Sequence, residues 1–285
     1  MSSLTAAQRD GYETDGFLLL EGLCTPSLEE YRRAVDDHAA VDPLTVIRFG
    51  KAGVPIHCKI PQLAERDPVF RKLARNARLI AAVEELIGPS LLFRDVVVAK
   101  PPRTGTVIHY HQDAAYWDVS APECVLSAWI ALDDAPVEAG CLRVVRGSHK
   151  SLLRHRLTIL GRPLPHAALR ALRAAVSLTG TGDNPRSAAG RALRAVKKVL
   201  LGNATRVFPA LSDLNDLHID PNRIPEDRIV ALPVQAGDAI LFPSRLIHGS
   251  GPNTGSSPRR AYIATYVARD AVPASETSRL LSARA

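Results

Sequence analysis

The sequence predicts an α+β protein, mainly β, in which helices come first and an antiparallel sandwich or barrel of short strands follows. Three observations predict this fold class. Apolar residues recur at helical spacing in the first 88 residues, and short runs rich in β-branched and aromatic residues follow from residue 91. A long interruption, residues 151–227, divides these runs into two sets. We therefore expect a single domain over residues 1–285 that carries the interruption as an insertion.

The N-terminal part is expected to form a helical support over residues 5–40. A short buried strand, GFLLLEG at residues 16–22, interrupts it. Pro26 then suits the first turn of the next helix, where its missing N–H costs nothing. Another helix is predicted over residues 67–88 and ends at Gly88, because a proline follows that glycine.

The strands are predicted from apolar runs that Gly, Pro, Asn and Asp separate, as is typical of short antiparallel strands. These runs lie at residues 91–100, 124–132, 141–145, 228–234, 238–242 and 261–267. Within the insertion, two stretches have helical spacing, at residues 166–178 and 187–202. The insertion is therefore expected to be helical, and a polar tail follows Pro273.

Composition indicates an ordinary globular chain. Apolar residues make up 46% and charged residues 23% of the sequence, and no stretch approaches the roughly 20 apolar residues of a membrane helix. The N-terminus is polar and acidic, unlike a signal peptide, so we expect a cytoplasmic protein without a membrane partner. The four cysteines have no CxxC pair and are expected to be small buried thiols.

Positive charge is concentrated in one segment. The net charge is +7, but residues 150–206 hold twelve basic residues against one acidic residue, so this segment carries +11 and the remainder −4. We interpret the insertion as a basic lid that favours an anionic or carrier-linked small molecule, although solvated helix surfaces would give the same pattern. A nucleic-acid partner is less favoured, because the basic stretch lacks the interleaved aromatic residues on which single strands stack.

The segment HYHQDAAYW places His111 and Asp113 two residues apart. On a strand, such residues face the same side, so the imidazole and the carboxylate could converge on one metal ion. His248 follows a later predicted strand and could supply the third ligand. Two histidines and one carboxylate form the facial triad of non-haem iron(II), which leaves positions open for co-substrate and dioxygen. An alternative, cupin-type site would use His109 with His111.

Four blocks of sequence resemble the phytanoyl-CoA dioxygenase family of iron(II)- and 2-oxoglutarate-dependent oxygenases. They are the DGF opening (residues 15–22), AKPP to HQDAAYW (99–117), GCLRVVRGSHK (140–150) and GDAILF to RRAY (237–262). Together they extend from residue 15 to residue 262, on both sides of the insertion. The resemblance implies a double-stranded β-helix, or jelly-roll, core of the cupin-like type, with the metal ligands at its mouth.

The resemblance also implies roles for individual residues. His111, Asp113 and His248 match the metal ligands, and Arg259 matches the arginine that receives the far carboxylate of 2-oxoglutarate. Its neighbour Arg260 would face the opposite side of a strand, so only one of the two can serve. Three further positions match co-substrate contacts: Ser250, Trp129 and Lys59. Ser250 could instead be a turn residue, Trp129 core and Lys59 a surface charge.

The implied activity is oxidation of a C–H bond of a small-molecule metabolite, by default hydroxylation, with iron(II), 2-oxoglutarate and dioxygen and release of succinate and carbon dioxide. Desaturation, epimerisation and cyclisation use the same chemistry, whereas halogenation is disfavoured because Asp113 is present. Tyr116 and Trp117 are candidate substrate contacts. An alanine- and arginine-rich chain suits bacterial specialised metabolism. Competing interpretations are an oxygenase of nucleic acids or carrier-bound substrates and a non-catalytic jelly-roll binding protein.

Overall fold

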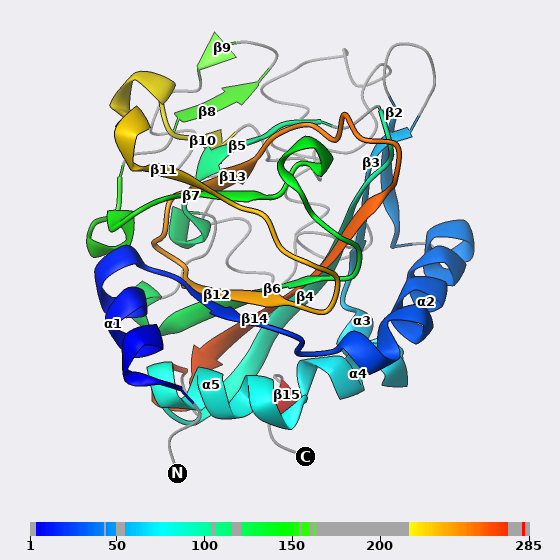
Figure 1. The fold of residues 1–285 in the computed structure, drawn as a ribbon, viewed down its shortest axis with the longest axis horizontal. Coiled ribbons are helices and arrows are strands. Elements are labelled where there is room, and N and C mark those ends of the chain that lie inside the picture. Colours follow the sequence, from blue (N-terminus) through cyan, green and yellow to red (C-terminus); the bar gives the residue numbers. More distant parts are fainter. Residues whose placement is uncertain are drawn as a thin grey trace, which may run out of the picture.

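The structure is a computed structural model that describes residues 4–42, 44–49, 55–103, 106–115, 121–153, 156–159, 162–163, 217–272 and 281–282. Two antiparallel sheets face each other, and helices cover the outer face of the larger sheet (Figure 1). The predicted jelly-roll with helical support is thereby confirmed. The α-helices within the described ranges are α1 (Ala6–Asp15), α2 (Leu28–Val41), α3 (Leu63–Arg66), α4 (Pro68–Ala74) and α5 (Ala77–Ile87).

The larger sheet, which has eight strands in the described part of the chain, supplies most of the framework. Its strands follow the order β1 (Leu18–Leu20), β12 (Ala239–Pro243), β6 (Val125–Ala131), β14 (Arg259–Ala268), β4 (Ser90–Lys100), β3 (Pro55–Pro61) and β2 (Val46–Phe49), with β15 (Leu281–Ser282) paired to β4. The sequence did not predict β2 and β3, which extend the sheet beyond β4.

Among the residues that the structure describes, the smaller sheet has four strands, in the order β11 (Ile229–Leu232), β7 (Leu142–Val145), β13 (His248–Ser250) and β5 (Ile108–His111). A further small sheet comprises β10 (Leu217–His218), β8 (Arg156–Ile159) and β9 (Arg162–Pro163). Most of the predicted insertion, including both expected helices, lies outside the described residues. None of the helices in the described part of the chain has the length and apolar character that crossing a membrane requires.

Two apolar clusters follow from the alternation of side chains along the large sheet. Tyr262, Ala264 and Tyr266 of β14 pack towards the helices, with residues of α5 such as Leu79. Residues on the opposite face of the large sheet point to the small sheet. There, Trp129 packs in a second cluster with residues of β7 and β12. The second cluster and the residues beside it line the space between the sheets, where a jelly-roll holds its ligands.

The helix predicted over residues 67–88 is two helices. α4 ends at Ala74, and Asn76 begins α5 by accepting hydrogen bonds on its side-chain oxygen from the backbone N–H groups of Arg78 and Leu79. An asparagine is among the best N-caps, and it competes here with continuation of the first helix. The apolar periodicity is continuous across this break, so it could not show the break.

Candidate active site

His111, Asp113 and His248 lie together between the sheets. His111 ends β5 and His248 begins β13, and the two are directly paired across the strands. Each of the three residues offers one ligand atom, and these atoms lie within 4.8 Å of one another. The Nε2 atoms of His111 and His248 are 3.6 and 3.8 Å from Oδ1 of Asp113. These distances are too long for hydrogen bonds, but one ion with bonds of about 2.1 Å can bridge them.

Asp113 does not continue strand β5, contrary to the sequence-based argument for the HxD pair. The strand ends at His111, and Asp113 begins a 3-10 turn, η2 (Asp113–Ala115). The buried residue between them explains the turn: the side-chain amide of Gln112 donates to the carbonyl oxygens of Ser151 and Arg245 and accepts from the N–H of Leu153. The two ligands therefore converge through a turn and not through strand alternation.

Hydrogen bonds orient each ligand. Nδ1 of His111 lies 2.8 Å from the carbonyl oxygen of His109, and Nδ1 of His248 lies 3.0 Å from that of Leu246. A carbonyl can only accept, so both Nδ1 atoms carry the proton and both Nε2 atoms are free to bind a metal. The Ser127 hydroxyl, 3.2 Å from Oδ2 of Asp113, supports the carboxylate.

The charge states also suit a metal. Burial raises the pKa of Asp113, but the neighbouring His248 and His111, together with Arg94, outweigh it and hold that pKa at about 2. Burial, together with His111, lowers the pKa of His248 to about 4. At neutral pH, Asp113 is therefore an anion and His248 is a neutral imidazole, the forms that coordinate divalent metals.

Arg259 is the second feature of the site. It begins β14 with 1% of its surface exposed, and its Nε and Nη1 atoms have no hydrogen-bond partner among the described residues. Its Cζ atom lies 5.5 Å from the centre of the Trp129 ring, a cation–π arrangement. Burial lowers the pKa of Arg259 to about 10, so it remains charged at neutral pH. A buried cation with free donors is costly unless an anion joins it, and a carboxylate is the best geometric match.

Arg260 has the opposite surroundings. Its guanidinium forms hydrogen bonds to both carboxylate oxygens of Asp133, at 2.8 and 2.9 Å, and to Asp36 of α2 at 2.9 Å. Arg260 therefore joins β14 to the helical layer. Of the two arginines, Arg259 is the one whose donors are available.

Ser250 is two residues beyond His248 on β13 and is 7% exposed. Its hydroxyl oxygen lies 2.6 Å from the Nζ atom of Lys100, which is fully buried at the end of β4. The sequence interpretation assigned Lys100 no role. The sequence does contain a signal for a buried lysine here, because Lys100 directly follows the apolar run VVVA and precedes two prolines.

Lys59 is half-buried on β3, opposite Val98 of β4. Directly opposed residues share a face of a sheet, and Val98 and Lys100 share theirs by alternation. Lys59 therefore lies on the same face as Lys100 and Arg259, one strand further out. Tyr116 and Trp117, the expected substrate contacts, lie outside the described residues.

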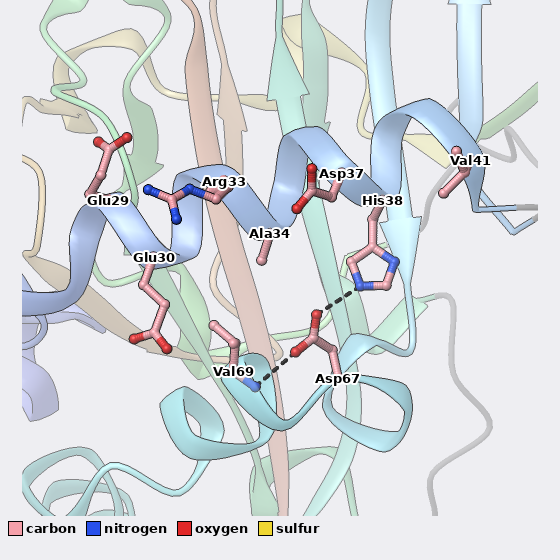
Figure 2. Close-up of a pocket in the computed structure, with 9 residues that line it drawn as sticks. All are labelled: Glu29, Glu30, Arg33, Ala34, Asp37, His38, Val41, Asp67 and Val69. Atoms are coloured by element: carbon pink, nitrogen blue, oxygen red, sulfur yellow. Dashed lines mark hydrogen bonds and ion pairs between the residues drawn. The ribbon is translucent and has the colours of Figure 1, made fainter.

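A surface hollow between α2 and the start of α4 is unrelated to these residues (Figure 2). His38 joins the two helices there: its Nε2 atom is 2.8 Å from Oδ2 of Asp67, and Oδ1 of Asp67 accepts from the N–H of Val69 (Figure 2). Nδ1 of His38 lies 3.1 Å from Asp42, so both ring nitrogens are engaged. These contacts attach α2 to α4 and indicate a structural role.

The family model for phytanoyl-CoA dioxygenase (PhyH) matches residues 12–261 of the chain. The chain belongs to this family. Among curated proteins, a probable phytanoyl-CoA dioxygenase of Caenorhabditis elegans is 26% identical over 290 residues, covering 94% of this chain and 77% of the relative. The peroxisomal phytanoyl-CoA dioxygenase of Homo sapiens is 24% identical over 283 residues, covering 94% and 69%.

Solved structures of this fold include the non-haem alpha-ketoglutarate-dependent epimerase SnoN from nogalamycin biosynthesis, which is 23% identical with a TM-score of 0.61 and covers 92% of this chain and 82% of its own. EctD from S. alaskensis with 2-oxoglutarate and 5-hydroxyectoine is 21% identical with a TM-score of 0.63, covering 94% and 78%. The expected class, an iron- and 2-oxoglutarate-dependent dioxygenase, is confirmed for this PhyH-family chain.

Proposed function

We propose that this PhyH-family chain uses dioxygen to oxidise a C–H bond of a small-molecule substrate, by default hydroxylating it. One oxygen atom goes to the substrate, and the other goes into the succinate that 2-oxoglutarate forms as it loses carbon dioxide. His111, Asp113 and His248 hold iron(II), and Arg259, with Ser250 and Trp129, binds the far carboxylate of 2-oxoglutarate. Iron, when bound, supplies the oxidising chemistry. Cytoplasmic action and a setting in bacterial specialised metabolism stay predictions from the sequence.

One observation carries this proposal: a buried guanidinium with free donors on the sheet face that also carries Ser127. Residues 259, 261, 263 and 265 alternate onto one face of β14, and Thr265 is paired with Ser127, the hydrogen-bond donor to Asp113. The anion site therefore lies on the face of the large sheet whose Ser127 supports the metal ligand Asp113. A binding protein without chemistry has no need of a metal triad beside a carboxylate receptor.

The protein residues bind and orient the co-substrate, and they exclude water from it. Arg259 fixes one end of the co-substrate through paired N–H donors, and Trp129 supports the guanidinium from its ring face. Ser250 offers a hydroxyl to the same carboxylate. Lys59, on the same face of the sheet and one strand beyond Lys100, is proposed as an outer contact with the co-substrate. The substrate would bind beside the metal ligands, and its position would decide which hydrogen reacts.

The test is an anaerobic titration of the protein with iron(II) and 2-oxoglutarate. Chelation of iron by 2-oxoglutarate is expected to give a weak visible charge-transfer band, and Asp113→Ala should lack it. A metabolite screen scored by substrate-stimulated succinate release would then identify the substrate. Absence of the band in the wild-type protein would contradict the proposed function.

The basic segment supports an anionic or carrier-linked substrate. Residues 150–206 carry a net charge of +11. Near the start of this segment, the carbonyl oxygen of Ser151 accepts a hydrogen bond from Gln112, the residue between His111 and Asp113. The curated relatives are named for phytanoyl-CoA, a coenzyme A thioester and thus an anionic, carrier-linked molecule. We propose that the insertion, residues 151–227, acts as a lid over this site.

A further inference from the structure

Two basic side chains occupy neighbouring positions on the inner face of the large sheet. Lys100 of β4 and Arg259 of β14 are directly paired across the strands, and their exposed fractions are 0% and 1%. Opposed residues of an antiparallel pair place their side chains close together on one face. Two buried like charges in adjacent positions are unfavourable, so this arrangement needs an anion or the loss of one charge.

Lys100 makes its contacts with the strand that carries Ser250. Its Nζ atom is 2.6 Å from the Ser250 hydroxyl oxygen and 2.5 Å from the carbonyl oxygen of Gly251. A protonated amine can only donate, so it forces the Ser250 oxygen to accept and leaves the hydroxyl hydrogen for another acceptor. A neutral amine can accept that hydrogen itself. The protonation of Lys100 therefore decides where the Ser250 hydroxyl points.

The groups around Lys100 disfavour its charge. Burial lowers the pKa of Lys100 to about 6, and the positive charges of Arg259 on β14 and Arg143 on β7 act in the same direction. Cys141, just before β7, would oppose them as a thiolate, but burial raises the pKa of this thiol. Lys59 adds a basic group on the same face. The two arginines that act on Lys100 therefore both disfavour its charged form.

We propose that Lys100 is a positioning residue for 2-oxoglutarate, and that the dianion binds together with one proton that Lys100 takes up. The inference rests on the proposed function. A carboxylate placed on Arg259 offsets the charge that repels a second cation, so the ammonium form of Lys100 becomes stable. That ammonium holds the Ser250 oxygen as an acceptor, and the Ser250 hydrogen then turns to the carboxylate.

The sign of the pH dependence follows. The Lys100 pKa rises when the dianion binds, so binding is strongest at low pH and weakens as pH rises through the range above the pKa of the empty pocket. Both carboxyl groups of 2-oxoglutarate are ionised throughout this range. The dissociation constant for 2-oxoglutarate should therefore rise about tenfold between pH 7 and pH 8.

The experiment is anaerobic calorimetry of 2-oxoglutarate binding to the iron(II)-loaded protein at pH 7.5, in two buffers with different ionisation enthalpies. The difference in heat measures proton uptake, and we expect about one proton per 2-oxoglutarate. Lys100→Met, which has a similar shape and no charge, should bind more weakly, take up no proton and show no pH dependence. The weaker binding by this variant should change the KM for 2-oxoglutarate more than kcat.

A double-mutant cycle with Ser250→Ala tests whether Lys100 influences 2-oxoglutarate binding through Ser250. If Lys100 acts through Ser250, the double variant should bind 2-oxoglutarate about as weakly as the weaker single variant; fully additive losses would overturn the positioning role. Wild-type binding without proton uptake, and with the same affinity at pH 7 and 8, overturns the inference and leaves the proposed function intact. No wild-type binding of 2-oxoglutarate overturns both.

Discussion

At the scale of single residues, the arginines at the start of β14 show how one position along a strand separates two roles. Arg259 points between the sheets with free donors, and Arg260 is engaged by two carboxylates. We expect Arg259→Ala to raise the KM for 2-oxoglutarate ten- to a hundredfold, because a charge-assisted contact to a carboxylate contributes about 1.5–3 kcal/mol. Initial rates measured against 2-oxoglutarate concentration at saturating iron test this expectation.

Arg260→Ala is the matched control. It removes the contacts to Asp133 and Asp36, so its expected effect is a lower melting temperature with little change in the KM for 2-oxoglutarate. A larger rise in KM for Arg260→Ala than for Arg259→Ala would place the carboxylate receptor at Arg260. The side chains of β14 would then face the opposite way.

The metal ligands give the second prediction at this scale. His111→Ala, Asp113→Ala and His248→Ala should each abolish iron-dependent turnover, since each removes one of three protein ligands. Iron binding by calorimetry, together with circular dichroism to verify the fold, separates loss of metal from loss of structure. Near-normal succinate formation at low iron by any one variant would remove that residue from the ligand set.

At the scale of elements, the pairing of β13 with β5 brings His248 beside His111. This pairing depends on Gly249, where an added Cβ atom would lie 2.7 Å from the carbonyl oxygen of Ile108. Gly249→Ala should push the strands apart, at a cost of about 1–3 kcal/mol in stability, and weaken iron binding. Melting temperature and iron affinity are the measurements.

Gly11→Ala provides the comparison, because a Cβ atom at Gly11 in α1 meets nothing within 4 Å. An alanine inside a helix is favoured over glycine by about 0.5–1 kcal/mol, so this variant should keep its iron affinity and lose no stability. If Gly249→Ala behaves in the same way, the close approach of the strands does not position His248.

At the scale of the whole molecule, the uneven charge provides the last prediction. If residues 150–206 attract an anionic substrate, the KM of the primary substrate should rise with salt, because exposed charges are screened beyond about 10 Å at 0.1 M ionic strength. Deleting residues 165–200 should reduce substrate turnover far more than uncoupled consumption of 2-oxoglutarate. A KM independent of salt, together with full turnover by the deletion variant, would show that the segment has no part in substrate binding.

The sequence by itself determined the helical support, most described strands of the large sheet, strands β7 and β11 of the small sheet, and the three residues that now form a metal-ligand cluster. These depend on local properties: side-chain alternation, turn residues and the chemistry of imidazole and carboxylate. Local patterns failed where a single side chain interrupts a regular element. Asn76 divides a continuous helical pattern, and Gln112 turns the chain between His111 and Asp113.

Only the tertiary structure decided which arginine has free donors and which lysine lies beside it. The pairing of Lys100 with Arg259 joins residues 159 positions apart, and it depends on the register between β4 and β14. Register is fixed by how whole strands bury their apolar faces, and no window of sequence around Lys100 contains Arg259. Burial has the same non-local origin, so the sequence supplied the charged groups and the packing of the two sheets determined which of them lack a counter-charge.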